Sequence, residues 1–390
     1  MTNILLICHD IPSMTVGATL PIYHLIKNLG PKYDIKLICF DSGKYPINHI
    51  QKELKDIETI KIPEYLTVTK QLKYTIKNMI SLDNLHTRSL LNYYYHKNMN
   101  TLIKNNVNDS DIIITDMPMA FYAKNINKPK IVYAFDAVSD YNHKMYKKSN
   151  TIPSKIYWYL NYLKIHNYEK VYNKFNNCIV VNQKDKQLLE KDIQIPITVV
   201  PNGVDTEFFK NTEKQEKTKL VFLGDMSTPP NNDAVKYFME EIHPLIIKET
   251  EIDFFIVGRN PSNYILELDN YDNIYVTGSV EDVRDYLPRG TIFITPMVSG
   301  TGIKNKILEA MSMNLPVVST SMGISGIDAE EGKEYLCADN NIVFKEKIME
   351  LINSPQLQLT IGDNARIFVE NNYSWVTSMK KIEELINELI

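Results

Sequence analysis

The chain has 390 residues, of which 44% are hydrophobic and 23% are charged, and its formal net charge is −4. This composition is typical of a globular protein and excludes disordered and fibrous classes, while the length exceeds the roughly 250 to 300 residues at which one core stops growing. We therefore expect two domains. No apolar run approaches the roughly 20 residues of a membrane span, and MTNILLICHD lacks the basic leader of a secretory signal, so we expect a cytoplasmic protein.

The first half alternates short apolar runs with segments of helical period. NILLICHD, YDIKLICF, DIIITD, KIVYAFD and NNCIVVN have the length and β-branched content of buried strands. This alternation predicts βα units and a parallel sheet. The cysteines at positions 8, 39, 178 and 337 are scattered through apolar stretches, which predicts buried free thiols and no zinc or redox site.

The second half repeats the pattern with LVFLG, DFFIVG, NIYVTG, TIFITP and PVVST, and residues 356–390 have a helical pattern throughout. The polar run KNTEKQEKTK separates the halves, because it cannot contribute to a core. We therefore predict an N-terminal domain over residues 1–205, a linker over 206–218, a second domain over 219–372, and a C-terminal helix over 373–390 that packs back on the first domain.

Charge is distributed unevenly between the halves. From residue 218 onward there are 14 Lys and Arg against 26 Asp and Glu, whereas residues 1–217 carry 29 against 21. Residues 141–175 interleave lysine with Tyr and Trp, a pattern that favours an anionic membrane surface or an anionic acceptor. The alternative is that long helices simply display solvated lysines.

Glycine recurs where the predicted strands of the second half end. Gly224, Gly258, Gly278 and Gly300 each follow an apolar run, and ligands of open parallel sheets bind beyond the carboxyl ends of the strands. A single such glycine is usually a turn requirement. Four at successive strand ends predict a crevice where the backbone must approach a ligand closely.

The stretch SGTGIKNKILEAM joins the strand TIFITPMV to a helix predicted over residues 303–313. One face of this helix is apolar, and a second stripe is formed by Gly302, Asn305, Lys306 and Glu309. Free N–H groups at the helix start, aided by Lys306, suit a phosphate or diphosphate. Glu309, two turns in, could accept hydrogen bonds from the hydroxyls of a ribose, so the stripe predicts a nucleoside diphosphate.

Other interpretations of this stretch exist. Lys306 and Glu309 could be an ordinary i,i+3 surface pair. A dinucleotide fingerprint is disfavoured because the pattern is GTGIKN and the acidic residue comes too early, and no G-x-x-x-x-G-K-[ST] phosphate loop occurs.

Residues 276–327, VTGSVEDVRDYLPRGTIFITPMVSGTGIKNKILEAMSMNLPVVSTSMGISGI, resemble the nucleotide-sugar half of glycosyltransferase family 4. LGDMSTPPNNDAVKYFMEEIHPLI and IVGRNPS resemble the branch that includes exopolysaccharide-associated sugar transferases, and VVPNGVDTEFF is similar to the inter-domain segment of the family. The resemblance implies the GT-B fold, an α/β architecture in which two Rossmann-like domains face each other across a cleft.

The resemblance also implies roles for single residues. The family uses two glutamates eight positions apart, and here the second matches Glu309, for the ribose, while Thr301 replaces the first. Lys306 would bind the diphosphate, with Lys304 and then Arg259 as weaker helpers. The remaining expected donor contacts are Gly278 and Val280 beside the base and Ser299, Gly300, Thr301 and Gly302 in the loop before the helix.

Two positions of the first half match acceptor-side features of the family. Gly17, in HDIPSMTVGATLPIYHLIKNLG, corresponds to a double-glycine loop that approaches the donor phosphates. Asp136 stands where relatives have a histidine near the transferred sugar, so the resemblance implies a polar contact there. Alternatively, Asp136 and Asp140 could cap the following helix.

Together these expectations describe a retaining, metal-independent hexosyltransferase. It would move a sugar from a UDP- or GDP-type donor, without a cofactor or metal, to a glycan or lipid-linked acceptor in polysaccharide synthesis, on the inner membrane face and without nucleic acid. Two alternatives remain open. Family members often use an Arg and a Lys after the first strand of the second domain for the diphosphate, and GDMSTPPNNDAV supplies neither. This absence and the replaced glutamate would suit a catalytically silent GT-B subunit that binds a partner glycosyltransferase or glycan. A GT-B nucleotide-sugar epimerase shares the fold but is disfavoured by the resemblance of residues 276–327.

Overall fold

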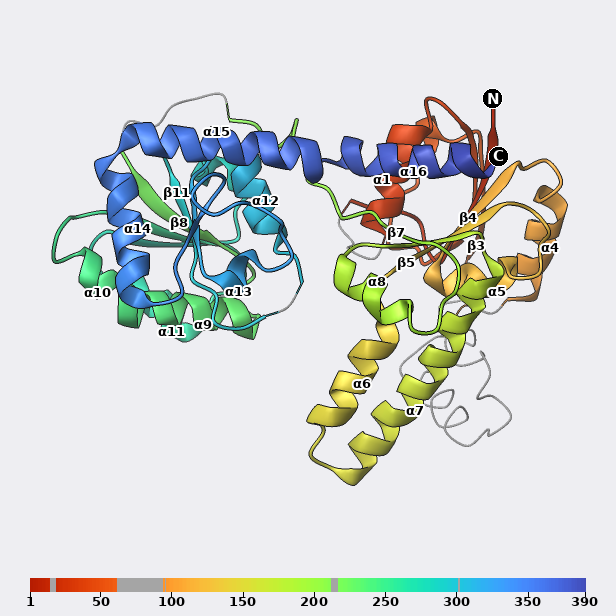
Figure 1. The fold of residues 1–390 in the computed structure, drawn as a ribbon, viewed down its shortest axis with the longest axis horizontal. Coiled ribbons are helices and arrows are strands. Elements are labelled where there is room, and N and C mark those ends of the chain that lie inside the picture. The colour runs from red at the N-terminus through yellow and green to blue at the C-terminus, as the bar shows by residue number, and fades with distance from the viewer. Residues whose placement is uncertain (15–18, 62–93, 95, 212–216, 301) are drawn as a thin grey trace. The chain divides into compact units, whose positions relative to one another are not determined.

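The computed structural model describes residues 1–14, 19–61, 94, 96–211, 217–300 and 302–390, and it divides into two compact units (Figure 1). The first unit comprises Met1–Asn202 together with Ser378–Ile390, and the second comprises Gly203–Thr377. Each unit is built around one parallel sheet. Of the predicted site residues, Gly17 and Thr301 lie outside the described residues.

The first unit contains a seven-stranded sheet in the order β3-β2-β1-β4-β5-β6-β7. Its strands are β1 (Asn3–Cys8), β2 (Asp34–Asp41), β3 (Asp56–Lys61), β4 (Ile112–Asp116), β5 (Lys130–Phe135), β6 (Asn177–Val180) and β7 (Ile197–Val199). All neighbours are parallel, and β1 pairs with both β2 and β4. The strand order therefore reverses between β1 and β4, which makes this the topological switch point of the sheet.

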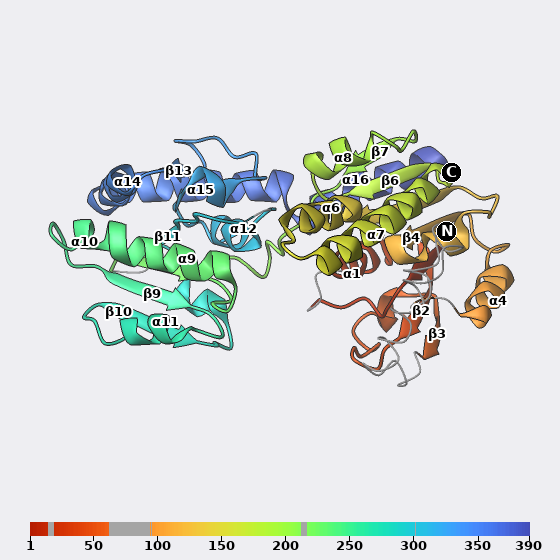
Figure 2. The same cartoon turned by 90° about the horizontal axis from the view of Figure 1, so that it is seen from below.

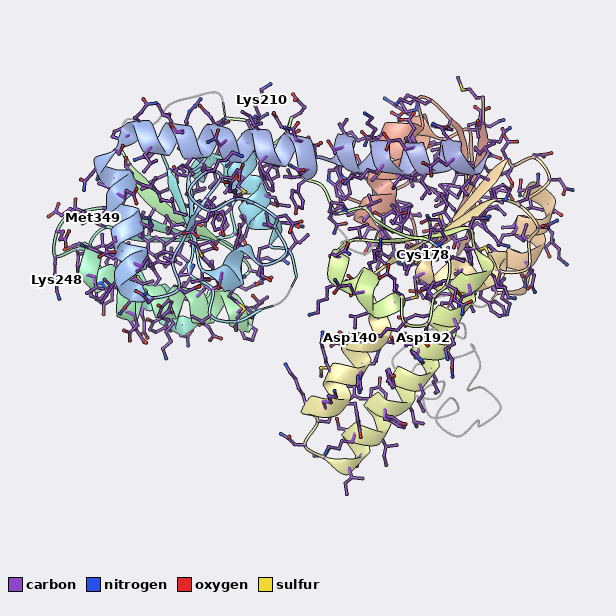
Figure 3. All side chains as sticks on the ribbon, in the orientation of Figure 1. Asp140, Cys178, Asp192, Lys210, Lys248 and Met349 are labelled. Carbon is purple, nitrogen blue, oxygen red and sulfur yellow. The ribbon has the colours of Figure 1, made fainter. Side chains whose placement is uncertain are left out.

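Helices cover this sheet, and two of them form a hairpin. The helices are α1 (Leu20–Leu29), α4 (Lys97–Asn106), α5 (Ala120–Ala123), α6 (Val138–Lys148), α7 (Ile152–Glu169) and α8 (Gln183–Leu189), with short turns η1 (Gln51–Glu53), η3 (Met117–Met119) and η4 (Lys170–Lys174). Helices α6 and α7 pack side by side and project from the sheet of this unit (Figures 1 and 2). Asp140 and Asp192 mark the root of this hairpin in Figure 3.

The second unit has a six-stranded parallel sheet in the order β10-β9-β8-β11-β12-β13. Its strands are β8 (Lys219–Leu223), β9 (Asp253–Val257), β10 (Ile274–Gly278), β11 (Ile292–Thr295), β12 (Val317–Ser319) and β13 (Leu336–Cys337). The helical segments are α9 (Pro229–Tyr237), η5 (Phe238–Ile242), α10 (His243–Ile246), α11 (Asn263–Leu268), η6 (Val283–Tyr286), α12 (Asn305–Ser312), α13 (Ser321–Ile324), α14 (Asn341–Asn353), α15 (Pro355–Asn372) and the start of α16 (Trp375–Leu389). The switch point lies between β8 and β11.

The ten apolar runs predicted as strands all form strands, and the expected two α/β domains with parallel sheets are confirmed. Strands β3, β7 and β13 were not predicted from the sequence. β7 and β13 are short, and β3 is a polar edge strand with no fully buried residue. Such strands lack the continuous apolar run that marks a strand covered on both faces. Cys8, Cys39 and Cys178 are buried free thiols, and Cys337 is a half-buried one.

The predicted linker over residues 206–218 differs from the structure at its N-terminal end. Thr206 and Phe209 accept hydrogen bonds from Arg366 through their carbonyls, and the Asn211 amide donates to the carbonyls of Leu287 and Met313. These residues are therefore fixed to the second unit. The chain returns to the first unit within α16, where Ser378 donates to the carbonyl of Pro201 at 2.8 Å.

Candidate functional site

The carboxyl ends of β8 and β11 flank the switch point of the second sheet, where ligands of doubly wound sheets bind. The loop after β11 leads into α12, which begins at Asn305 rather than at the predicted 303. Ile307, Leu308 and Met311 are buried, as the apolar face predicts. The N-cap residue of α12 is Lys304, and its side chain makes no capping hydrogen bond to the N–H groups of the first turn.

Lys306 connects α12 to the end of β8. Its Nζ donates to the carbonyl of Leu223 at 2.8 Å and to Oδ1 of Asn231 at 2.8 Å, and it lies 3.9 Å from the centroid of the Phe222 ring. Burial, with a smaller contribution from Lys304, lowers the pKa of Lys306 to about 7, although Glu309 opposes the shift. All three contacts are with uncharged groups, so no anion in these contacts offsets the desolvation of the charged Lys306 ammonium. A bound anion would stabilise the charged form of Lys306 and raise its pKa.

Glu309 lies one turn further along α12 and is half-buried. Burial raises the pKa of its carboxyl to about 7, and the charge of Lys306 offsets only part of this. Within the described ranges, its carboxylate has neither a hydrogen-bond partner nor an ion-pair partner within 4.0 Å. The interpretation of Lys306 and Glu309 as a surface ion pair is therefore wrong, and the carboxylate is available to accept hydrogen bonds.

The glycines at the strand ends and in the loop before α12 differ in what surrounds them. A Cβ at Gly258 would lie 1.7 Å from the carbonyl oxygen of Gly224, and one at Gly224 would lie 2.5 Å from the Asn231 amide nitrogen. Gly258 is therefore required by packing against backbone, and a side chain at Gly224 would displace the Asn231 amide that contacts Lys306. This corrects the expectation that all the strand-end glycines serve a ligand. Gly278 and Gly302 have positive φ and no atom within 4 Å of an added Cβ, so their backbone faces open space.

The other predicted donor contacts are engaged by neighbouring groups. Lys304 donates to the carbonyls of Gly302 and Met322, and Arg259 pairs with Asp225 at 2.7 Å. Ser299 contacts Asp233 at 3.4 Å. Gly300, with φ of 120°, lies against Pro230, and Val280 packs on the apolar core of the second unit.

Asn231 is a site residue that the sequence analysis missed. Its side chain accepts from Lys306 and donates to the carbonyl of Asp225 at 2.9 Å, so it orients the lysine. It lies in the first turn of α9, which starts at Pro229. The sequence signal was the segment STPPNNDAV directly after β8, because residues that follow a strand reach the ligand edge.

Asp136 follows β5 in the first unit and is exposed. Although the residue is exposed overall, partial desolvation of its carboxyl raises the pKa of Asp136, and the neighbouring Asp185 adds to the rise. The helix-cap alternative is wrong, because Ala137 is the N-cap of α6 and no side chain caps it. Asp140 instead pairs with Lys144.

Two further properties bear on ligands. In the part of the chain that the structure describes, no three His, Cys, Asp or Glu side chains cluster closely enough to hold a metal ion. No helix of the described ranges combines the length and the apolar character required to cross a bilayer.

Residues 217–354 match the family model described as "Glycosyl transferases group 1". An uncharacterized 44.6 kDa protein in the cps region of Klebsiella pneumoniae is 26% identical over 243 residues, or 60% of this chain and 62% of that protein. The capsular polysaccharide biosynthesis glycosyltransferase CapM of Staphylococcus aureus is 23% identical over 212 residues, covering 48% of this chain and 53% of that protein. The chain thus spans between about half and three fifths of these curated relatives.

Solved structures match the whole chain. Anabaena HepE in complex with UDP superimposes with a TM-score of 0.67 at 14% identity, covering 100% of both chains. The lipopolysaccharide outer core galactosyltransferase WaaB superimposes with a TM-score of 0.61 at 14% identity, also over 100% of both chains. The fold is GT-B, as the sequence resemblance implied.

Proposed function

We propose that the protein is a glycosyltransferase that takes its sugar from a nucleoside-diphosphate donor bound at α12. The observation that carries this proposal is the combination of a half-buried Lys306 held by neutral groups and a Glu309 whose carboxylate has no partner among the described residues. Both lie on the helix at the switch point of the second sheet. A diphosphate and a ribose supply the anion and the hydroxyl donors that these two side chains lack.

In this site Lys306 and the N–H groups at the start of α12 would bind the diphosphate, and Glu309 would accept from the ribose hydroxyls. Gly278 and Gly302 would allow the donor to approach the backbone. HepE structures contain UDP and UDP-glucose, which supports a UDP-type donor here, with GDP as the second choice. No cofactor is proposed.

The chemistry follows from where charge develops. As the glycosidic bond breaks, negative charge grows on the leaving diphosphate, and we expect Lys306 and the N–H groups at the start of α12 to stabilise it. Retention of configuration, hexosyl transfer and independence of a metal are proposed on the family resemblance alone. Asp136, a polar group at the ligand edge of the first sheet, is proposed to contact the transferred sugar or the acceptor.

The acceptor is proposed to be a glycan or lipid-linked sugar reached at the inner membrane face. Support comes from the α6–α7 hairpin, which presents Ile152 and Ile156 at 75% and 52% exposure and Tyr141, Tyr157 and Tyr159 at 38 to 58%. Exposed lysines at positions 147, 148 and 155 lie in the same hairpin. Apolar side chains beside cations suit an anionic bilayer surface. A capsular relative, CapM, adds support for polysaccharide synthesis.

The test is ligand-observed NMR of the full-length protein with UDP, GDP, ADP, CMP and NAD. We expect one nucleoside diphosphate to bind selectively and Glu309→Ala to weaken it at least tenfold. Glu346→Ala, the same substitution at an exposed glutamate on α14 of the same unit, is the matched control. If none of the five binds, the transferase proposal fails and a silent GT-B subunit that binds a partner becomes the better account.

A further inference from the structure

A histidine–aspartate pair lies at the switch point of the first sheet. His9 directly follows β1, Asp116 ends β4, and these two strands are parallel neighbours with Ile7 opposite Thr115. Neither residue was predicted from the sequence to be functional, and the donor site proposed above does not use them. Both occupy the position in a doubly wound sheet where ligands bind.

Hydrogen bonds fix the orientation of the imidazole. Oδ2 of Asp116 accepts from the backbone N–H of His9 at 2.8 Å and lies 2.6 Å from Nδ1 of the same residue. An ionised carboxylate can only accept, so Nδ1 carries the proton. The neutral ring therefore has a lone pair on Nε2, and Nε2 has no partner among the residues that the structure describes.

The burial of Asp116 indicates that its carboxylate does more than bind the backbone N–H that follows β1. The Asp116 side chain is 1% exposed and its Oδ1 has no hydrogen-bond partner in the described part of the chain, whereas the His9 ring is 14% exposed. A carboxylate with one unbonded buried oxygen is costly, and an asparagine could hold the same backbone N–H without placing a charge there. The charge is explained if it serves the histidine, by fixing its tautomer and its basicity.

The groups around His9 determine which ligand it suits. Asp116 and Asp10 are the charged groups that act on the ring, and the edge of Tyr94 packs against it at 5.6 Å between centroids. Asp10 is itself engaged by the backbone N–H groups of Ile11 and Ser42. Burial has the largest single effect and lowers the pKa of His9, but the charge and hydrogen bond of Asp116 together with the charge of Asp10 outweigh it, so the pKa is raised. Two carboxylates disfavour an anion, whereas a neutral hydroxyl can donate to Nε2.

We propose that Nε2 of neutral His9 accepts a hydrogen bond from a hydroxyl of the acceptor sugar. This inference rests on the proposed transferase function and extends it to the first unit. Because only the neutral ring can accept, protonation of His9 abolishes the contact. Asp116 is the positioning residue, and its charge sets the pH at which the contact is lost.

The experiment follows the His9 Cε1–Hε1 signal by NMR during pH titration of the full chain. The probes are UDP and then a panel of methyl glycosides of the common hexoses, N-acetylhexosamines and deoxyhexoses, each added with UDP present. His9→Asn supplies the assignment and retains a side-chain amide that can donate to Asp116 while lacking Nε2. Asp116→Asn removes the charge. His166→Asn is the control, because His166 also faces an aspartate, Asp192 at 3.8 Å, but lies on α7.

We expect at least one glycoside to shift the His9 signal and to lower the pKa of His9, since binding requires the neutral form. His9→Asn should lower the affinity for that glycoside at least tenfold and leave the affinity for UDP unchanged. Asp116→Asn should lower the pH below which glycoside binding is lost. His166→Asn should change neither. If UDP binds but no glycoside affects His9, or if His9→Asn binds glycosides like the wild type, the inference is overturned. Glycoside binding without any nucleotide binding would keep the His9 site and overturn the transferase proposal instead.

Discussion

At the scale of single residues, Lys306 makes the sharpest prediction, because its pKa of about 7 places its titration within the working range. A bound diphosphate favours the charged lysine, so the pKa rises on binding and protons are taken up above pH 7. Affinity for the selected nucleotide should therefore fall as pH rises above 7, up to tenfold per unit.

Lys306→Met should weaken the nucleotide about 10- to 100-fold at pH 7, or about 1.4 to 2.7 kcal/mol. Isothermal titration calorimetry between pH 7 and 9.5 gives the nucleotide affinity of the wild type and of Lys306→Met. The titration of the nucleotide itself affects both proteins equally and cancels in the ratio of wild-type to variant affinity. That ratio should shrink with rising pH, and a constant ratio would contradict the assignment. Lys304→Met, whose amine contacts two carbonyls of the adjoining loops, should have the smaller effect.

The sequence predicted the stripe that contains Lys306 and Glu309, because helical spacing depends only on neighbours along the chain. It could not predict what holds the lysine, since Leu223 and Asn231 come from segments 83 and 75 residues earlier. The same limit applies to His9 and Asp116, which are 107 residues apart. Pairings of this kind follow from strand order, and periodicity does not specify strand order.

At the scale of elements, the close approach of β8 and β9 depends on a missing side chain. Gly258→Ala would place a Cβ 1.7 Å from the Gly224 carbonyl oxygen, so one strand end must move. We expect a loss of more than about 3 kcal/mol of unfolding free energy, measured by urea denaturation. Gly332→Ala is the matched control, with φ of 78° but no atom within 4 Å, and should cost about 1 kcal/mol. Equal losses of unfolding free energy in the two variants would show that backbone strain at positive φ, and not the contact with the Gly224 carbonyl, sets the cost.

Element prediction succeeded where a strand is buried on both faces and failed at the edges. β1 and β11 are almost wholly buried, so their apolar runs are continuous. β3 reads DIETIK and is half-exposed, so no run marks it. Residues 141–175 were singled out for lysines among Tyr and Trp, with long solvated helices as the alternative. The projection of the α6–α7 hairpin from the sheet could not be derived from composition.

At the scale of the whole molecule, the chain enters the first unit twice, and α16 is the second entry. Ile382 and Ile386 on α16 are fully buried, while Ile390 is 57% exposed. Ile382→Ala should destabilise the first unit by about 2 to 5 kcal/mol. Hydrogen exchange measured by mass spectrometry should show faster exchange in β1 and β2 and unchanged exchange in β8 and β9, and Ile390→Ala should alter neither. Equal loosening of both sheets would mean that the units do not unfold separately.

The hairpin leads to a prediction about where the whole protein resides. Vesicles with about 30% anionic lipid should bind the protein, and binding should weaken with salt, because exposed lysines near a charged surface contribute about 1 kcal/mol each. Ile152→Ser with Ile156→Ser should reduce vesicle binding at least tenfold through lost apolar burial, and Lys147→Glu with Lys148→Glu should do the same through charge.

Ile342→Ser with Ile367→Ser is the matched control, since these isoleucines are 60% and 56% exposed on the second unit. Equal loss from the control pair would mean that general surface hydrophobicity, and not the hairpin, drives binding. Because the vesicle assay needs no donor, its failure would remove the membrane from the proposal and leave the nucleotide site untouched.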